Sequence, residues 1–306
     1  VLVEEEFDVL HLHEPFTPGP TQTAVLLHPA PIIATFHSAG DSAAYRYLRK
    51  PVIAASKRLA HRVAVSKDAE ELPQRYIGGE YEILFNGVEL DDYRTAVPHP
   101  APGPTIFFCG RHEERKGLDV LLAAMAQLPD DVTLWVASTG PDTERLQRAY
   151  PHDQRVVWLG RVSDEDKIAH LAGATLFCAP SLHGESFGVV LIEAMAAGTA
   201  IVASALDGYR NVATDDIDAV LVEPGDVDAL AAALRRTLDD DALRSRLVEA
   251  GQRRADHFSM RTLAELYAER YVRIHAEALQ RGAEDGDDAP MRTRLARMMT
   301  RVRRPA

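Results

Sequence analysis

The segments expected to form strands and helices alternate along the chain in two separate series, and this alternation constrains the fold more than any other feature. Strands that alternate with helices build parallel sheets through right-handed crossovers. A stretch with four prolines in eight residues, VPHPAPGP (97–104), separates the two series and is typical of an interdomain linker. The expected strands cover residues 7–13, 31–37, 61–66, 81–85, 105–109, 133–137, 155–160, 175–180 and 200–204.

The pattern predicts an α/β chain with two Rossmann-like domains that face a cleft. We assign residues 1–96 to a partial first domain and residues 105–257 to a complete second domain. A crossover helix is expected over residues 258–280, and residues 281–306 form a tail. Ligands of such sheets bind outside the carboxyl ends of the strands. The polar residues that follow the strands are therefore the candidate site residues.

The acidic composition excludes one broad class of partner. The 306 residues have a formal net charge of −12, whereas proteins that bind nucleic acid usually carry a basic surface. We therefore expect no nucleic-acid partner. No run of 18 apolar residues is present, so no membrane-spanning helix is expected either. Cys109 and Cys178 lie in apolar strand segments and are expected to be reduced.

The last sixteen residues differ in charge from the rest of the chain. They contain six arginines and no acid, and they follow EDGDD (284–288), which is typical of a flexible spacer. Leu295, Met298, Met299 and Val302 would form one apolar stripe of a helix. This pattern predicts a helix that lies on an anionic membrane surface. A disordered solubilising tail explains the same composition.

Histidines follow the first two expected strands. His37 ends the strand 31–37 and is predicted to donate a hydrogen bond to a substrate oxygen or phosphate, unless it only caps the strand. His11 and His13 would share one face of the first strand, whereas Glu14 points the other way. Because no third ligand is evident, we expect no metal site here.

A cluster of cations follows the strand 105–109. Gly110 is followed by Arg111, Arg115 and Lys116, and a helix is expected to begin at Gly117. Free backbone N–H groups and the helix dipole would add to the charge of these side chains, which favours an anion site. A diphosphate fits this arrangement better than a single carboxylate. A solvated charged loop is the alternative.

Two glutamates follow the strand 175–180. Glu185 precedes an expected helix between Gly184 and Gly188, and Glu193 lies two turns further. The two carboxylates could act as acid and base, or could accept hydrogen bonds from sugar hydroxyls, which fits better beside an anion site. Residues 160–167 (GRVSDEDK) also follow a strand, but a capped surface helix explains them as well.

These motifs together resemble a known family of enzymes. GRHEERKG (110–117) and GESFGVVLIEAMAAGTAIVAS (184–204) resemble the retaining GT-B glycosyltransferases of family 4. The fuller set looks like the phosphatidylinositol α-mannosyltransferases of actinobacteria, and the resemblance runs from about residue 6 to about residue 275. The additional matching segments are FDVLHLHEP (7–15), IATFHS (33–38), HRVAVS (61–66), NGV (86–88) and GRVSDEDK (160–167).

The resemblance implies roles for the residues of the second domain, which would be the nucleotide-sugar-binding domain. Arg111 and Lys116 match the pair that holds the donor diphosphate, with Arg115 as a neighbouring cation. Glu185 matches the acid that contacts the donor mannose, and Glu193 the acid near the ribose.

The remaining implied roles concern the nucleotide and the acceptor. Asp164 and Lys167 match residues on the nucleotide side, with the backbone near Val162 beside the base. His37 matches the histidine that faces the sugar and the acceptor phosphate. Three further residues are assigned to the donor site: Ser186, Phe187 and Gly188. The expected catalytic residues are His37, Arg111, Lys116 and Glu185.

The reaction implied by the resemblance is transfer of mannose from GDP-mannose to the inositol of phosphatidylinositol with retention of the α configuration. The cations would stabilise negative charge on the leaving GDP, and a same-face mechanism is preferred because no covalent nucleophile is evident. No tightly bound cofactor is expected. The sequence leaves open whether a Mg²⁺ ion accompanies the donor. We expect a cytoplasmic enzyme, peripheral on the inner face of the plasma membrane. The alternatives are another family 4 hexosyltransferase with a different donor or acceptor, and an inactive fragment that binds a nucleotide sugar.

The sequence departs from the family pattern in three places. The family begins with a strand and a glycine-rich loop that have no counterpart here, so we expect an N-terminally truncated domain that lacks roughly 60–90 residues. Phe85 stands where the family usually has proline. Ser138 stands where it usually has glycine.

Overall fold

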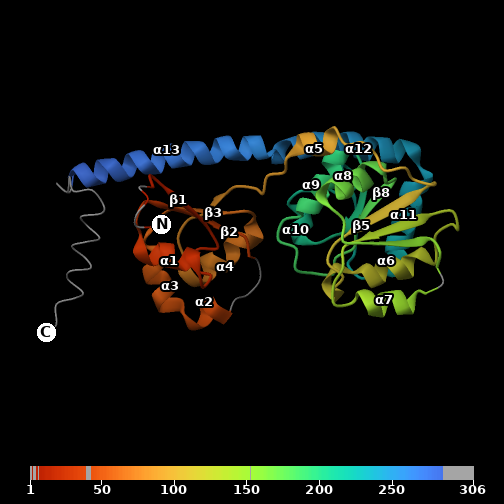
Figure 1. Ribbon diagram of the computed structural model, residues 1–306, viewed down its shortest axis with the longest axis horizontal. Helices are drawn as coiled ribbons and strands as arrows, with labels where there is room; N and C mark the ends of the chain where they lie inside the picture. Colours follow the sequence, from red (N-terminus) through yellow and green to blue (C-terminus); the bar gives the residue numbers. More distant parts are fainter. Residues whose placement is uncertain (1, 3–4, 6, 39–42, 152, 285–306) are drawn as a thin grey trace. The chain divides into compact units, whose positions relative to one another are not determined.

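The computed structural model describes residues 2, 5, 7–38, 43–151 and 153–284 (Figure 1). The chain divides into two compact units, each with its own core. Unit 1 comprises Val1–Phe85 and Ala264–Ala306, and unit 2 comprises Asn86–Leu263. Each unit is built on a parallel sheet with helices between the strands. The predicted α/β class is therefore confirmed.

Unit 1 contains a four-stranded parallel sheet in the order β1-β2-β3-β4. All five residues of β2 are buried, as expected of a strand that is covered on both faces. Helices α1–α4 lie on one side of this sheet, and α13 runs along the other side (Figure 1). The strands are β1 (Leu10–His13), β2 (Ile32–Phe36), β3 (Leu59–Ala64) and β4 (Glu82–Ile83); the helices are α1 (Pro20–Leu27), α2 (Ala43–Tyr47), α3 (Arg49–Ser56), α4 (Lys67–Ile77) and α13 (Met260–Glu284).

Unit 2 contains a six-stranded parallel sheet in the order β10-β9-β8-β5-β6-β7. Successive strands are added outward in one direction from β5 and in the other direction from β8, so the strand order reverses between these two neighbours. The strands are β5 (Thr105–Cys109), β6 (Thr133–Ala137), β7 (Val156–Gly160), β8 (Leu176–Ala179), β9 (Ala200–Ser204) and β10 (Val220–Val222).

Helices cover both faces of the unit 2 sheet. Helix α6 packs against α11, while α9 packs against α5, α8 and α12. Ser163, Asp226 and Asp240 cap their helices by accepting a backbone N–H bond, which satisfies one of the free donors of the first turn. The helical segments are α5 (Leu90–Arg94), η1 (Glu114–Lys116), α6 (Leu118–Met125), α7 (Thr143–Ala149), α8 (Asp164–Gly173), α9 (Val189–Ala197), α10 (Asp207–Arg210), α11 (Val227–Asp239), α12 (Asp241–Ala255) and η2 (Asp256–Phe258).

The proline-rich stretch 97–104 lies within unit 2 and not between the units, which differs from the predicted linker. The backbone N–H of His99 donates to the carbonyl of Ala169 at 2.9 Å, and the His99 ring stacks on Trp135 with 5.2 Å between centroids. Gly173 lies so close that a Cβ there would fall 2.1 Å from the His99 carbonyl oxygen. Closely spaced prolines disfavour helix interiors and central strands, but they do not prevent an extended segment from packing against a domain.

Several short helices are not evident from the sequence pattern, namely α1, α5, α7 and α10. Helices α2 and α3 are separated at Leu48, and Pro51 does not interrupt α3. Pro51 lies in the first turn of α3, where a backbone N–H has no partner within the helix, so proline is tolerated.

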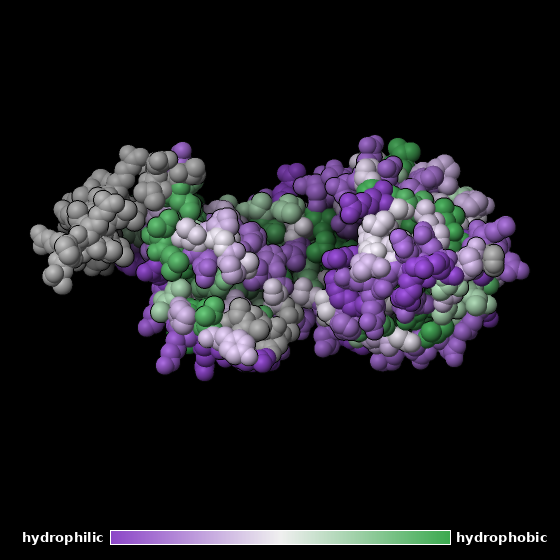
Figure 2. Space-filling view, turned by 60° about the horizontal axis from the view of Figure 1, so that its bottom comes forward, coloured by the Kyte–Doolittle hydropathy of each residue, from purple (hydrophilic) through white to green (hydrophobic). Residues whose placement is uncertain are grey.

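The predicted basic tail and its acidic spacer lie almost entirely outside the described residues, which end at Glu284. Among the helices that the structure describes, none is long and apolar enough to cross a membrane. Cys109 and Cys178 are both free thiols. On the face seen in Figure 2 the surface of unit 2 is mostly hydrophilic, and apolar patches interrupt the surface of unit 1.

Candidate functional site

The reversal of strand order between β5 and β8 marks one edge of the unit 2 sheet as a ligand site. In open parallel sheets, the loops that follow two such strands leave the sheet in opposite directions and open a crevice at its carboxyl edge. Here the two loops are residues 110–117 and 180–188. They touch, since Leu182 donates its backbone N–H to the Arg115 carbonyl at 2.7 Å. A Cβ at Gly117 would fall 1.9 Å from the carbonyl oxygen of Pro180, so only glycine allows this approach.

Two cations from the loop after β5 converge on Glu185 in the loop after β8. Lys116 Nζ lies 2.5 Å from Oε1 of Glu185, and Arg115 Nη1 lies 3.5 Å from the same oxygen. Arg115 is held from its other side by Glu113, whose Oε1 lies 2.7 Å from Nε. The Glu185 and Lys116 side chains are only 12% and 19% exposed. The pair is therefore shielded from solvent, which strengthens its electrostatic interaction.

Buried groups behind Glu185 fix the direction of its carboxylate. Ser181 donates a hydrogen bond to Oε1 of Glu185 at 3.0 Å, and the hydroxyl of Tyr209 lies 3.0 Å from Ser181 Oγ. Burial raises the pKa of Tyr209, so the phenol stays protonated. Gly208 approaches so closely that a Cβ there would fall 1.8 Å from the Glu185 carbonyl oxygen. Tyr209 and Ser181 were not predicted from the sequence. Their positions after expected strands, Ser181 after β8 and Tyr209 after β9, could have indicated them.

The second glutamate has a cation of its own. Lys167 Nζ donates to Oε1 of Glu193 at 2.9 Å, and the two side chains are 20% and 14% exposed. The Lys167 ammonium lies 6.0 Å from the ring centroid of Tyr93, on helix α5. Burial and then the negative charge of Glu193 raise the pKa of Tyr93. Cys109 ends β5 nearby, and burial raises the pKa of its thiol to about 11. Tyr93 is a further residue that the sequence analysis did not include.

The other residues predicted for the donor site differ in their surroundings. Arg111 is exposed and lies 3.6 Å from Glu113, so Arg115 and not Arg111 reaches Glu185. Asp164 is exposed in the first turn of α8. The remaining predicted residues lie in loops that follow two strands. Val162 lies between β7 and α8, and the loop between β8 and α9 contains Ser186, Phe187 and Gly188.

Two of these loop residues have structural partners. Phe187 is buried and meets the Phe258 ring edge-on, with 5.6 Å between centroids. Gly188 is the N-cap of α9 with a φ of +100°, a conformation that side chains rarely adopt. The loop before α9 is therefore anchored at its end, while the Glu185 carboxylate contacts Lys116, Arg115 and Ser181.

His37 lies in unit 1, at the carboxyl end of β2, and its backbone is held by Glu14. Oε1 of Glu14 accepts the backbone N–H groups of both His37 and Ser38 at 2.7 Å. His13 Nδ1 lies 2.7 Å from Nε2 of the His37 ring. His11 stacks on His13 with 4.5 Å between ring centroids, which confirms that both lie on one face of β1.

One polar cluster in unit 1 consists of His11, His13 and His37, and all three have a lowered pKa. Burial, followed by repulsion from His13 and His37, lowers the pKa of His11 to about 4. Burial also lowers the pKa of His13 and of His37. Within the described part of the chain, no group of three histidine, cysteine or acidic side chains could hold a metal ion.

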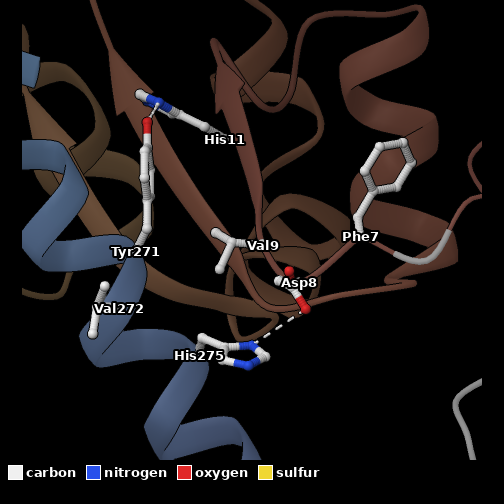
Figure 3. A pocket seen from close by; sticks show the side chains of 7 residues that line it. All are labelled: Phe7, Asp8, Val9, His11, Tyr271, Val272 and His275. Carbon is white, nitrogen blue, oxygen red and sulfur yellow. Dashed lines mark hydrogen bonds and ion pairs between the residues drawn. The ribbon is translucent and has the colours of Figure 1, made fainter.

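A cavity of about 640 Å³ lies between helix α13 and the start of β1 with the residues that precede it (Figure 3). His11 and Tyr271 line its polar wall, and Val9 and Val272 are among its apolar residues. The hydrogen bond between His11 and Tyr271 crosses from the strand to the helix in Figure 3.

The chain is similar to known glycosyltransferases along most of its length. A family model described as glycosyl transferases group 1 matches residues 91–254, and one described as glycosyltransferase family 4 matches residues 1–92. The phosphatidyl-myo-inositol mannosyltransferase of Mycobacterium leprae is 39% identical over 258 residues, which cover 82% of this chain and 69% of that protein. The protein of the same description from Mycolicibacterium smegmatis is 36% identical over 268 residues, with coverage of 84% and 69%.

A solved structure shares the fold. Sucrose-phosphate synthase from Thermosynechococcus elongatus superposes with a TM-score of 0.74 over 89% of this chain and 74% of that chain. The two sequences are 24% identical, so the likeness concerns the arrangement of the elements. The fold that the sequence predicts, with two Rossmann-like units, is thus found in a known structure.

Proposed function

The chain belongs to the glycosyltransferases of family 4 with the GT-B fold, and on this premise we propose that it transfers mannose from GDP-mannose to the inositol of phosphatidylinositol. The names of its relatives support the acceptor and the sugar, because proteins 36% and 39% identical to this chain are described as phosphatidyl-myo-inositol mannosyltransferases. The product would be a phosphatidylinositol mannoside with the α configuration of the donor retained.

The observation that carries the proposal is the convergence of Lys116 and Arg115 on Glu185, where the loops after β5 and β8 meet. A nucleoside diphosphate needs several cations in a shielded position, and a sugar needs acceptors for its hydroxyls. Here both kinds of group lie within hydrogen-bond distance of one another. We assign Lys116, Arg115 and the more exposed Arg111 to the diphosphate.

The glutamates are assigned to hydroxyl groups of the donor. Glu185 would accept hydrogen bonds from the mannose, with its carboxylate oriented by Ser181 and Lys116. Glu193, paired with Lys167, would accept hydrogen bonds from the ribose. The nucleotide would extend past Asp164 and the backbone near Val162, which follow β7.

The proposed chemistry exchanges one carbon–oxygen bond for another on the same face of the sugar. The bond between the anomeric carbon and the β-phosphate oxygen breaks, and the inositol hydroxyl oxygen forms the new bond. Its proton passes to the leaving phosphate oxygen, so no external base is needed. Lys116 and Arg111 would stabilise the charge that develops on GDP. His37 would donate a hydrogen bond to the sugar or to the acceptor phosphate.

A lipid acceptor implies that the enzyme works at a membrane. We propose a peripheral position on the inner face of the plasma membrane, with the arginines of residues 291–306 facing anionic lipid. The proposed reaction needs no cofactor that resides in the protein. Transfer assays with and without a chelator decide whether a Mg²⁺ ion accompanies the donor.

Transfer of radiolabel from GDP-mannose to phosphatidylinositol vesicles tests the proposal. We expect a labelled lipid from which α-mannosidase releases the label, and no comparable product from UDP-glucose. Lys116→Met should abolish the product, whereas Lys57→Met, at an exposed lysine of unit 1, should leave it unchanged. Labelling from UDP-glucose alone, or labelling of another acceptor alone, would assign the chain to a different transferase reaction. GDP binding without any transfer would identify a nucleotide-sugar-binding protein.

A further inference from the structure

A continuous set of side-chain contacts runs through unit 1 from helix α13 to His37. The Tyr271 hydroxyl lies 2.7 Å from Nδ1 of His11, and the other ring nitrogen of His11 lies 2.8 Å from the Thr35 hydroxyl. His11 stacks on His13, and Nδ1 of His13 lies 2.7 Å from Nε2 of His37. These contacts connect two strands and a helix that lie far apart in the sequence.

The contact between His13 and His37 fixes which nitrogen of His37 faces a ligand. Because Nε2 of His37 is engaged by His13, Nδ1 is the ring nitrogen that remains for substrate. The backbone of His37 is held by Glu14, so the ring cannot exchange its nitrogens without losing its place beside His13. Burial keeps both rings neutral at pH 7, since it lowers the pKa of each.

A neutral imidazole carries one N–H group, and the other nitrogen can only accept a hydrogen bond. Phosphate oxygens and other anionic oxygens can only accept. A neutral His37 can therefore bond such an oxygen from Nδ1 only if its proton resides there. Its Nε2 must then accept a hydrogen bond, and the donor must be Nδ1–H of His13. A free histidine side chain favours the opposite tautomer, with its proton on Nε2.

We propose that His13 is a positioning residue that donates its Nδ1–H to Nε2 of His37 and so holds His37 in the Nδ1–H tautomer. His37 then presents a hydrogen-bond donor to an anionic oxygen of the substrate. This inference rests on the proposed function, in which His37 meets a sugar or phosphate oxygen. It deepens that function by assigning the donor atom and the residue that selects it.

The position of His13 is itself determined by the groups behind it. His11 is fixed on both nitrogens, by Tyr271 and by Thr35 (Figure 3 draws the bond to Tyr271). Thr35 in turn lies 2.9 Å from the hydroxyl of Tyr267, one turn before Tyr271 on α13. The stack of His11 on His13 has an interplanar angle of 28°, so a shift of one ring displaces the other.

Nitrogen NMR of the ¹⁵N-histidine-labelled full chain at pH 7.5 tests the tautomer directly, with the His37 signals identified by their loss in His37→Asn. We expect a protonated Nδ1 and an unprotonated Nε2 on His37. His13→Asn keeps an N–H donor near the place of Nδ1 and should preserve this tautomer. His13→Asp offers only an acceptor and should move the proton to Nε2. His13→Phe keeps a ring on His11 but removes the donor, so His37 should show a mixture dominated by the Nε2–H form.

His275→Asn is the matched control, because His275 lies on α13 outside the set of contacts and should leave the His37 signals unchanged. A His37 ring protonated on Nε2 in the unaltered chain would overturn the proposal. So would a His13→Phe variant that keeps the Nδ1–H tautomer. The NMR signals can be measured without catalytic activity. Failure of the tautomer proposal is therefore distinguishable from failure of the proposed reaction.

The kinetics of mannose transfer give a second readout if the chain has the proposed activity. We expect His13→Phe to lower kcat by about 10-fold to 100-fold, the range for losing a hydrogen bond to a charged group. KM for GDP-mannose should change by less than about threefold, and His13→Asn should restore most of the rate. An equal loss of rate in His13→Asn and His13→Phe, with intact folding by circular dichroism, would contradict a positioning role.

Discussion

Lys116 Nζ lies 2.5 Å from Oε1 of Glu185, although 69 residues separate the two in the sequence. They meet because their strands, β5 and β8, are neighbours in the sheet of unit 2 and both loops leave its carboxyl edge. Neither loop could form this pair alone. The tight contact of Gly117 with Pro180 and the hydrogen bond from Leu182 to Arg115 hold the two loops in register.

Substitution of Lys116 by Met should weaken GDP binding without unfolding unit 2. The variant removes one charge-assisted hydrogen bond from the diphosphate, which corresponds to about 1.5–3 kcal/mol, or about 10-fold to 100-fold in Kd. Glu185 keeps Arg115 and Ser181 as partners, so its carboxylate is not left without a partner. Titration calorimetry against Lys57→Met measures the effect. Equal affinities would place the diphosphate elsewhere.

A methyl group at Gly208 should disturb the Glu185 loop. The Cβ of Gly208→Ala would lie 1.8 Å from the carbonyl oxygen of Glu185, so the backbone must move. We expect a loss of about 1–3 kcal/mol in the free energy of unfolding and a weaker affinity for GDP. In Gly103→Ala the nearest atom would be 3.7 Å away, so this variant is the matched control. Thermal unfolding followed by tryptophan fluorescence reports on unit 2, because Trp135 and Trp158 both lie there.

The ion pair of Lys167 and Glu193 should contribute to stability because it is shielded. Lys167→Met leaves Glu193 largely buried without its cation, and we expect a cost of about 1–3 kcal/mol in urea unfolding. The double variant Lys167→Met/Glu193→Gln should lose less than the sum of the single variants. The exposed pair of Glu144 and Arg148 is the control, and Arg148→Met should cost less than about 0.5 kcal/mol. Additive losses at the buried pair would contradict its role.

Ser138 should become more favourable as glycine. Its φ is +83°, in the region that side chains rarely adopt, and it follows β6 where the related family usually has glycine. Glycine would relieve this strain, but it would also give the unfolded chain more conformational entropy, which offsets part of the gain. We therefore expect Ser138→Gly to raise the free energy of unfolding by about 0.5–1 kcal/mol. Ser245→Gly on the exposed face of α12 should instead lose about 0.5–1 kcal/mol. The comparison fails if both variants shift the urea midpoint in the same direction.

The histidine cluster should make unit 1 less stable in acid. The folded-state pKa of His11 is about 4 and its ordinary value is 6.5, so between these values the unfolded chain binds more protons. The contribution of the neutral His11 ring to the free energy of unfolding is complete above about pH 6.5 and decreases as the pH falls toward 4. For one histidine the slope reaches at most about 1.4 kcal/mol per pH unit. The nearby groups are His13, His37, Glu14, Tyr267 and Tyr271.

Hydrogen exchange of the β2 amides at pH 7 and pH 5, corrected for the intrinsic effect of pH on exchange, measures this loss in unit 1. His11→Asn should remove the largest part of the slope, because burial affects its pKa most. A slope that is unchanged in His11→Asn would show that other groups cause the acid sensitivity.

Much of the fold follows from local sequence patterns. The apolar runs 105–109, 133–137 and 200–204 form strands with those same bounds. Ser66 and Ser163 immediately precede helical segments in the sequence, and each caps its helix by accepting a backbone N–H bond of the first turn. A buried strand and a capped helix depend mainly on residues that are adjacent in the sequence, so the sequence pattern is sufficient to locate them.

The short helices could not be located in this way. Helix α5 has only five residues and is stabilised by packing against α8 and α9, with Tyr93 buried. Helices of this length are marginal in isolation, so their existence depends on tertiary contacts. The packing of α5 also places Tyr93 beside Lys167. Other tertiary contacts, those of His99 with Ala169 and Trp135, hold the stretch 97–104 in unit 2.

By itself, the sequence determined the α/β class, the strand ends that carry polar residues, and the motifs of the cations and the two glutamates. Only the tertiary structure decided which of these residues meet: Lys116 and Arg115 with Glu185, Lys167 with Glu193, and His13 with His37. Local propensity acts over a few residues, whereas these pairs depend on which strands are neighbours in a sheet and on how buried partners such as Tyr209 and His11 orient them.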